Sequence, residues 1–92
     1  MKKIDAQQQT DMRRMGRFRI SHKTLELAPN AAREILSGMI VVRATSMFEY
    51  DGIDYLGAHE RFSRVEAGSE VPFYHFRVQD LVGGKYHVEW DT

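Results

Sequence analysis

The sequence predicts an α+β domain in which an antiparallel meander of about four strands packs against one short helix, beside a basic N-terminal helix or arm. Three observations predict this class. Apolar and polar residues alternate through much of residues 39–92, helix formers fill residues 28–38, and residues 1–24 are polar and basic. Because a chain of 92 residues forms one core, we expect residues 1–92 to be a single domain.

The N-terminal segment is predicted to be helical over residues 3–15. Ile4, Met12 and Met15 share one face of such a helix, and Gly16 suits the left-handed conformation that ends many helices. A short polar helix is marginal on its own, so it stays open whether this segment orders only against the body or a partner.

Residues 17–27 alternate like a strand. Arg17 to Ile20 alternates polar and apolar side chains, and Leu25 and Leu27 resume the same period after four polar residues. The pattern is compatible with a small hairpin, and the pairing of this segment stays open.

A short helix is predicted over residues 28–38. Pro29 lies near its start, Gly38 at its end, and good helix formers between them. Its apolar stripe, Ala31, Ala32, Ile35 and Leu36, is expected to pack on the sheet.

Residues 39–50 and 53–62 are predicted to be the first two strands of the antiparallel sheet. Asp51-Gly52 between them is typical of a two-residue type I′ turn. The apolar alternation changes face at Gly57, which predicts a bulge there.

The last two strands have the most regular alternation. Pro72 suits the first residue of a strand, and Gly83-Gly84 is predicted to turn the chain between residues 74–79 and 86–91. The predicted core face of these strands consists of Tyr74, Phe76, Val78, Tyr86, Val88 and Trp90.

Charge is divided unevenly along the chain, although the formal net charge is zero. Residues 1–24 hold seven bases and two acids, so their net charge is +5, and residues 25–92 carry −5. This asymmetry indicates a polyanionic partner. The alternative is that the basic segment folds back on the acidic body.

The basic segment concentrates four guanidiniums in seven residues, with Phe18 among them. Guanidinium suits phosphate, and an aromatic ring offers a nucleic-acid base a stacking surface. We therefore predict contacts to nucleic-acid phosphates. The predicted binding residues are Lys2, Lys3, Arg13, Arg14, Arg17, Phe18, Arg19 and Lys23.

The rest of the surface is interpreted as structural. Arginines and histidines at 43, 61, 64, 75, 77 and 87 are interspersed with acids, a pattern typical of a solvated sheet face. Tyr50, Phe62 and Phe73 can extend a core or an interface, and the core is the preferred interpretation in so small a domain.

No catalytic, metal or cofactor site is predicted. The histidines at 22, 59, 75 and 87 lack metal-ligand spacing, and a surface pair of His75 and His87 is the simpler interpretation. His59 and Glu60 point to opposite faces of a strand and do not converge. The chain has no cysteine, and its longest apolar run is far shorter than a membrane span, so we expect a cytoplasmic protein without a membrane partner.

The whole-chain pattern resembles small phage-encoded anti-CRISPR proteins, specifically inhibitors of the type I-F surveillance complex. The resemblance rests on a cysteine-free single domain of 92 residues, on the arm MKKIDAQQQTDMRRMGRFRI, and on the hairpins FEYDGIDYLGAHERF and FYHFRVQDLVGGKYHVEW without an enzymatic signature. These inhibitors share size and role but not sequence, so no residue role is carried over. The resemblance implies a protein that binds Cas proteins plus guide RNA and blocks hybridisation of target DNA to the guide.

The leading hypothesis is therefore a non-enzymatic inhibitor that binds a nucleoprotein complex and is monomeric when free. In this hypothesis the arginines contact guide phosphates and the acidic body contacts a basic protein channel. The alternatives are a small regulator that binds free RNA or DNA, and a phage assembly or interaction module that uses sheet edges.

Overall fold

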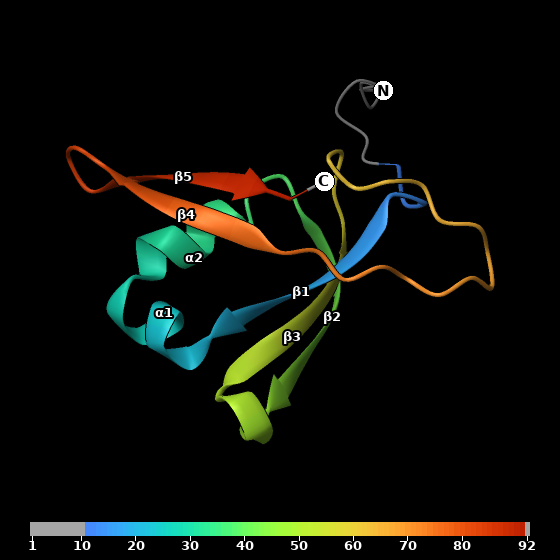
Figure 1. Cartoon of the computed structure of the whole chain (residues 1–92), viewed down its shortest axis with the longest axis horizontal. Helices are drawn as coiled ribbons and strands as arrows, with labels where there is room; N and C mark the ends of the chain where they lie inside the picture. Colours follow the sequence, from blue (N-terminus) through green and yellow to red (C-terminus); the bar gives the residue numbers. More distant parts are fainter. Residues whose placement is uncertain (1–10, 92) are drawn as a thin grey trace, which may run out of the picture.

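The computed structural model describes residues 11–91, which form a small α+β domain with two antiparallel sheets (Figure 1). One sheet has three strands in the order β1-β3-β2, and the other is the hairpin β4-β5. α2 lies against β5 of the hairpin, and α1 lies beside α2 at the end of β1 (Figure 1). The elements are β1 (Met15–Ser21), α1 (His22–Leu27), α2 (Pro29–Ile35), β2 (Ile40–Met47), the 3-10 turn η2 (Phe48–Tyr50), β3 (Gly52–Ala58), β4 (Phe76–Leu81) and β5 (Lys85–Trp90).

The expected α+β class is confirmed, but the single four-stranded meander is wrong. β1 supplies an extra strand that pairs with β3 from Met15–Ala58 to Ser21–Gly52. The chain then leaves this sheet after Ala58 and returns beside the outer edge of β1, where the Arg17 amide donates to the Pro72 carbonyl at 2.9 Å and the Tyr74 amide donates to the Arg17 carbonyl at 2.7 Å. β3 is therefore central, and within residues 11–91 the outer side of β2 is an open edge.

The core lies between the two sheets and is mainly aromatic. Phe62 stacks on Tyr74 with ring centroids 4.5 Å apart and meets Trp90 edge-on at 5.2 Å. Phe18 stacks on Tyr55 at 5.2 Å and also meets Trp90 edge-on. These rings join the inner face of the three-stranded sheet to β5. The buried cluster consists of Phe18, Ile20, Ala32, Ile35, Tyr55, Phe62 and Trp90.

The predicted helix over residues 3–15 falls mostly outside the described residues, and its described end is wrong. Residues 12–13 form a turn and the strand begins at Met15. Gly16 does not end a helix but pairs with Gly57 inside the sheet. A Cβ on Gly16 would lie 2.6 Å from Tyr74 Cδ2 and 2.7 Å from Phe62 Cδ2, so close ring packing, rather than a left-handed backbone, requires glycine there.

The short strand expected from Arg17 is confirmed as part of β1, whereas Leu25 and Leu27 lie in a helix. Ser21 caps α1 because its Oγ accepts a hydrogen bond from the Thr24 amide at 3.1 Å. The polar residues that follow β1 therefore start a helix instead of turning a hairpin.

The helix expected within residues 28–38 is confirmed as α2. Pro29 occupies its first turn, and Gly38 follows it with φ of +71°. Its apolar residues Ala32 and Ile35 belong to the core cluster. The expected apolar stripe is thus the face that α2 buries.

β2 and β3 pair as predicted, but their connection and bulge differ. The 3-10 turn η2 precedes Asp51, which alone adopts a left-handed conformation with φ of +49°, so the two-residue type I′ turn is wrong. The register shifts between Val41 and Arg43, opposite Gly57 and Leu56. The bulge is therefore on β2 rather than at Gly57.

The C-terminal hairpin follows its prediction closely. β4 and β5 pair from Phe76–Trp90 to Leu81–Lys85, and Gly83 and Gly84 turn the chain with φ of +85° and +73°. Phe76, Val88 and Trp90 reach the core, whereas Val78, which pairs with Val88 and was expected on the core face, is exposed. The hairpin thus projects beyond the body.

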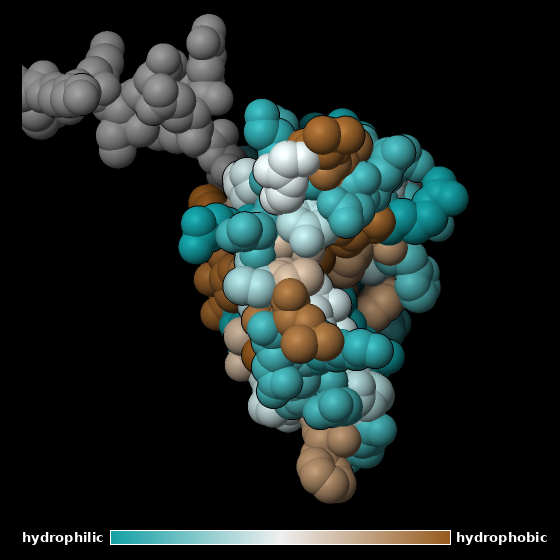
Figure 2. Space-filling view, turned by 90° about the vertical axis from the view of Figure 1, so that its left-hand side faces the viewer, coloured by the Kyte–Doolittle hydropathy of each residue, from teal (hydrophilic) through white to brown (hydrophobic). Residues whose placement is uncertain are grey.

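Exposed apolar side chains are scattered rather than gathered in one continuous patch on the face seen in Figure 2, where brown groups lie among teal ones. Phe48 and Val82 are almost fully exposed, at 96% and 97%. Among residues 11–91, each helix is too short or too polar to cross a lipid bilayer.

Candidate nucleic-acid interface

The outer face of the three-stranded sheet gathers positive charge. Alternation along β1 points Arg17 and Arg19 away from the core, with side chains 41% and 44% exposed. Arg19 Nε donates to Asp54 Oδ1 on β3 at 2.8 Å, and this hydrogen bond raises the pKa of Arg19. Arg17 lies farther from the same carboxylate, at 3.9 Å. Asp54 therefore holds Arg19 firmly and leaves the Arg17 guanidinium available.

Two aromatic side chains lie near the Arg19 guanidinium. Its guanidinium carbon lies 3.7 Å from the ring centroid of Tyr50 and 5.0 Å from that of Phe73. The Tyr50 hydroxyl donates to Asp54 Oδ2 at 3.4 Å. The prediction that all three rings belong to the core is thus confirmed for Phe62 and wrong for Tyr50 and Phe73. The rings of Tyr50 and Phe73 form a basic and aromatic surface together with Arg19.

A third arginine joins this face from the far strand. Arg17 on β1 and Arg43 on β2 both oppose Leu56 on β3, one from each side. Among residues 11–91, no carboxylate oxygen lies within 4.0 Å of Arg43. We call Arg17, Arg19 and Arg43 the arginine face. The groove that Arg17 and Arg43 line is also lined by Thr45, Met47, Asp54, Tyr55, Leu56 and Val71.

The predicted role of Phe18 as a stacking surface is wrong. Its ring is fully buried, at 0% exposure, against Tyr55 and Trp90. The alternation of β1 explains this, because the residue between two outward arginines points inward. Any stacking surface on this face is supplied by Tyr50 or Phe73 instead.

Arg13, Arg14 and Lys23, which were also predicted to bind, do not join the arginine face. Arg14 is half-buried and its Nη1 donates to the Phe62 carbonyl at 3.0 Å, so it supports the loop after β3. Arg13 is exposed at the turn before β1, about 20 Å along an extended strand from Arg19. Lys23 is exposed on α1. Lys2 and Lys3 lie outside the described residues.

His59 is the buried histidine of the described chain. It lies against the rings of Phe62 and Trp90, and its Nδ1 accepts a hydrogen bond from the Arg61 amide at 3.1 Å. Burial lowers the pKa of His59. Within residues 11–91, no three His, Asp or Glu side chains converge as a metal site would require. His59 is thus a neutral core residue at neutral pH.

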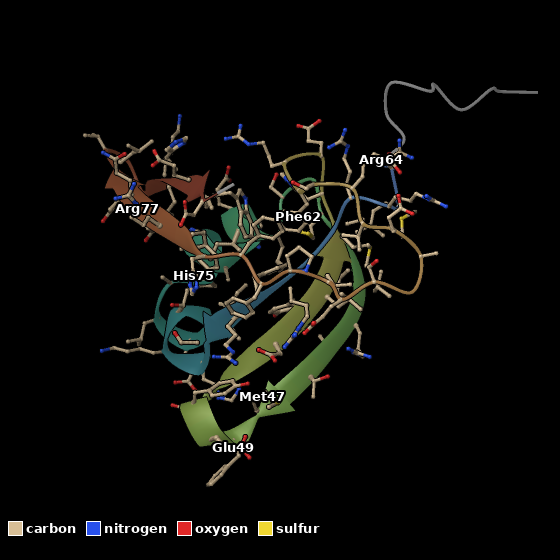
Figure 3. The ribbon with its side chains drawn as sticks, turned by 45° about the vertical axis from the view of Figure 1, so that its right-hand side comes forward. Met47, Glu49, Phe62, Arg64, His75 and Arg77 are labelled. Carbon is tan, nitrogen blue, oxygen red and sulfur yellow. The ribbon has the colours of Figure 1, made fainter. Side chains whose placement is uncertain are left out.

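The edge of β2 lies next to the arginine face. Ile40, Val41 and Val42 are exposed on this strand, and Figure 3 shows Met47 at its end with Glu49 just beyond. Sequence alternation identified β2 as a strand but gave no sign that it would be an edge, since strand order depends on pairing distant in sequence. Such an edge offers unpaired backbone groups to a protein partner.

The comparisons give no relative from which a function could be transferred. No family model matches the chain, and no curated protein or solved structure matches it either.

Proposed function

We propose that this protein is a non-enzymatic inhibitor that binds a nucleoprotein complex through its arginine face. The observation that carries the proposal is the presentation of Arg17, Arg19 and Arg43 on one sheet face with one carboxylate, Asp54, among them. These four groups carry a net charge of +2. Guanidiniums placed this way suit phosphate oxygens of a nucleic acid.

The open edge of β2 supports a complex, rather than a free strand, as the partner. Arg43 of the arginine face and the neighbouring Met47 both lie on this edge strand. A partner that contains protein and nucleic acid can pair a strand with this edge and place phosphates on the adjoining face. Both surfaces are then used in one interaction.

The specific form of the proposal is inhibition of a type I-F CRISPR surveillance complex, as the sequence resemblance implies. Occupying guide phosphates would block target DNA from reaching the guide. Because such complexes operate inside the cell, the proposal places the protein in the cytoplasm. It assigns the protein no reaction of its own.

Charge removal on the arginine face tests the proposal. We expect Arg17→Gln to weaken binding to the assembled complex and to reduce the slope of log affinity against log salt by about 0.7, as one fewer phosphate is neutralised. Arg77→Gln is the matched control, because Arg77 pairs with Glu89 on the hairpin and lies away from Met47 in Figure 3. Circular dichroism checks that both variants fold. Equal binding by Arg17→Gln and wild type would contradict the proposal.

Self-assembly through β2 is the second candidate function, favoured by the exposure of this strand on both faces. It predicts concentration-dependent dimers in light scattering, abolished by Val42→Lys, which places a charge on the edge strand. Val82→Lys is the control, since it makes the same substitution at an exposed valine on the hairpin of β4 and β5. A strict monomer at every concentration would exclude this candidate.

A further inference from the structure

We infer that Arg17 and Arg43 form a two-sided clamp for one phosphodiester of a single-stranded nucleic acid, with Leu56 as the floor between them. This inference rests on the proposed function and names the ligand that the arginine face takes. It also assigns a binding role to Arg43, which lies outside the basic N-terminal segment.

The spacing across the sheet suits one phosphate. Arg17, Leu56 and Arg43 form one row over three adjacent strands. Neighbouring strands are about 4.8 Å apart, so the two arginine backbones are separated by about 10 Å. A phosphate can accept charge-assisted hydrogen bonds of about 2.8 Å from two guanidiniums whose backbones are this far apart.

A groove lies between these side chains. It has a volume of about 440 Å³ and is lined by both arginines, by the hydroxyl-bearing Thr45 and by the apolar Leu56 and Val71. The half-buried Leu56 limits water on one side of the bound group, which strengthens the charge interaction.

Asp54 also lines the groove, and its negative charge repels an anion. The net charge of the groove therefore depends on which groups neutralise Asp54. Its Oδ1 is bonded to Arg19 at 2.8 Å, and its Oδ2 lies within 3.4 Å of the Tyr50 hydroxyl. Arg19 offsets the Asp54 charge directly. The Arg17 guanidinium is 3.9 Å from Asp54 Oδ2. Among residues 11–91, Arg43 has no carboxylate oxygen within 4.0 Å. The charges of these two arginines therefore leave the groove positive.

A single strand fits this face better than a duplex. Phe73 and Tyr50 both lie near Arg19, whose partner Asp54 lines the groove, and each residue is partly exposed. Unstacked bases can reach such rings, whereas bases inside a duplex cannot. The phosphate in the clamp and a base near Phe73 would belong to neighbouring nucleotides.

A double-mutant cycle with a fluorescein-labelled 12-nucleotide oligouridylate tests the clamp at low salt. We expect Arg17→Gln and Arg43→Gln each to weaken binding about tenfold, as loss of a charge-assisted bond does, and Arg77→Gln to leave it unchanged. The double variant is expected to lose less than the product of the single losses, because both side chains hold the same phosphate. Backbone NMR spectra confirm that each variant folds.

Several results would overturn the clamp. Unchanged binding by Arg43→Gln, or single losses that multiply in the double variant, would show that the two arginines do not share a phosphate. Equal competition by a polyglutamate of the same charge would show a general acidic-peptide site instead. Wild-type protein that binds the assembled complex but not the oligonucleotide would reject the clamp and leave the proposed function standing, whereas binding to neither would reject both.

Discussion

Truncation of Phe62 to alanine is expected to destabilise this domain strongly. The ring is 1% exposed and packs against the rings of Phe18, His59, Tyr74 and Trp90. Phenylalanine-to-alanine changes in cores cost about 3–5 kcal/mol, and the four neighbouring rings place this site at the upper end, about 4–5 kcal/mol. A domain of this size has a free energy of unfolding of about 5–14 kcal/mol, so the substitution removes about a third of it or more.

Urea unfolding followed by tryptophan fluorescence measures this cost, because Trp90 packs against Phe62. Phe48→Ala is the matched control: the same substitution at a side chain that is 96% exposed should change the free energy of unfolding by less than about 0.5 kcal/mol. A cost below about 1 kcal/mol for Phe62→Ala, or equal costs for the two variants, would refute the described core.

Three further predictions concern single side chains. Burial lowers the pKa of His59 in the folded state, so its contribution to stability is present above the unfolded pKa of about 6.5 and is lost as pH falls. In urea titrations at several pH values, His59→Gln should therefore reduce the loss of unfolding free energy at low pH. The control variant His87→Gln should leave that loss unchanged. Ser21→Ala removes the cap of α1 and should cost about 1 kcal/mol, whereas Ser63→Ala should cost less in the same assay. Gly16→Ala should lower the melting temperature, since its Cβ meets two rings below 3 Å, and an unchanged value would contradict the packing there.

Local patterns in the sequence predicted most elements, while the arrangement of the sheets could not be predicted. The hairpin of β4 and β5 and the helix α2 follow from alternation and from Pro29, Gly83 and Gly84, which act within a few residues. The insertion of β3 between β1 and β2 depends on the pairing of β1 with β3, whose paired residues are 31 to 43 positions apart. No local pattern encodes that choice.

The helix α1 shows how a short apolar period can mislead. Leu25 and Leu27 are two residues apart, as on one face of a strand, yet Leu27 is exposed and Leu25 alone packs at the core. The local signal that decides the structure is the Ser21 cap, which satisfies the Thr24 amide.

The candidate site was partly predictable. The arginine cluster led to Arg17 and Arg19, and the same alternation that placed them outward would have placed Phe18 in the core. Arg43 enters the site only through the strand order β1-β3-β2, which brings it level with Arg17 across Leu56. Tyr50 and Phe73 likewise reach Arg19 only in the folded chain.

Binding of the labelled wild-type protein to an assembled type I-F surveillance complex tests the proposed function most directly. The same titration is run with free guide RNA and with duplex DNA of equal charge, across a salt series. The proposed function predicts tight binding to the complex, weak binding to the free strands, and an affinity that falls as salt rises. Binding to the free strands alone, or no binding to the complex at any salt concentration, would contradict it.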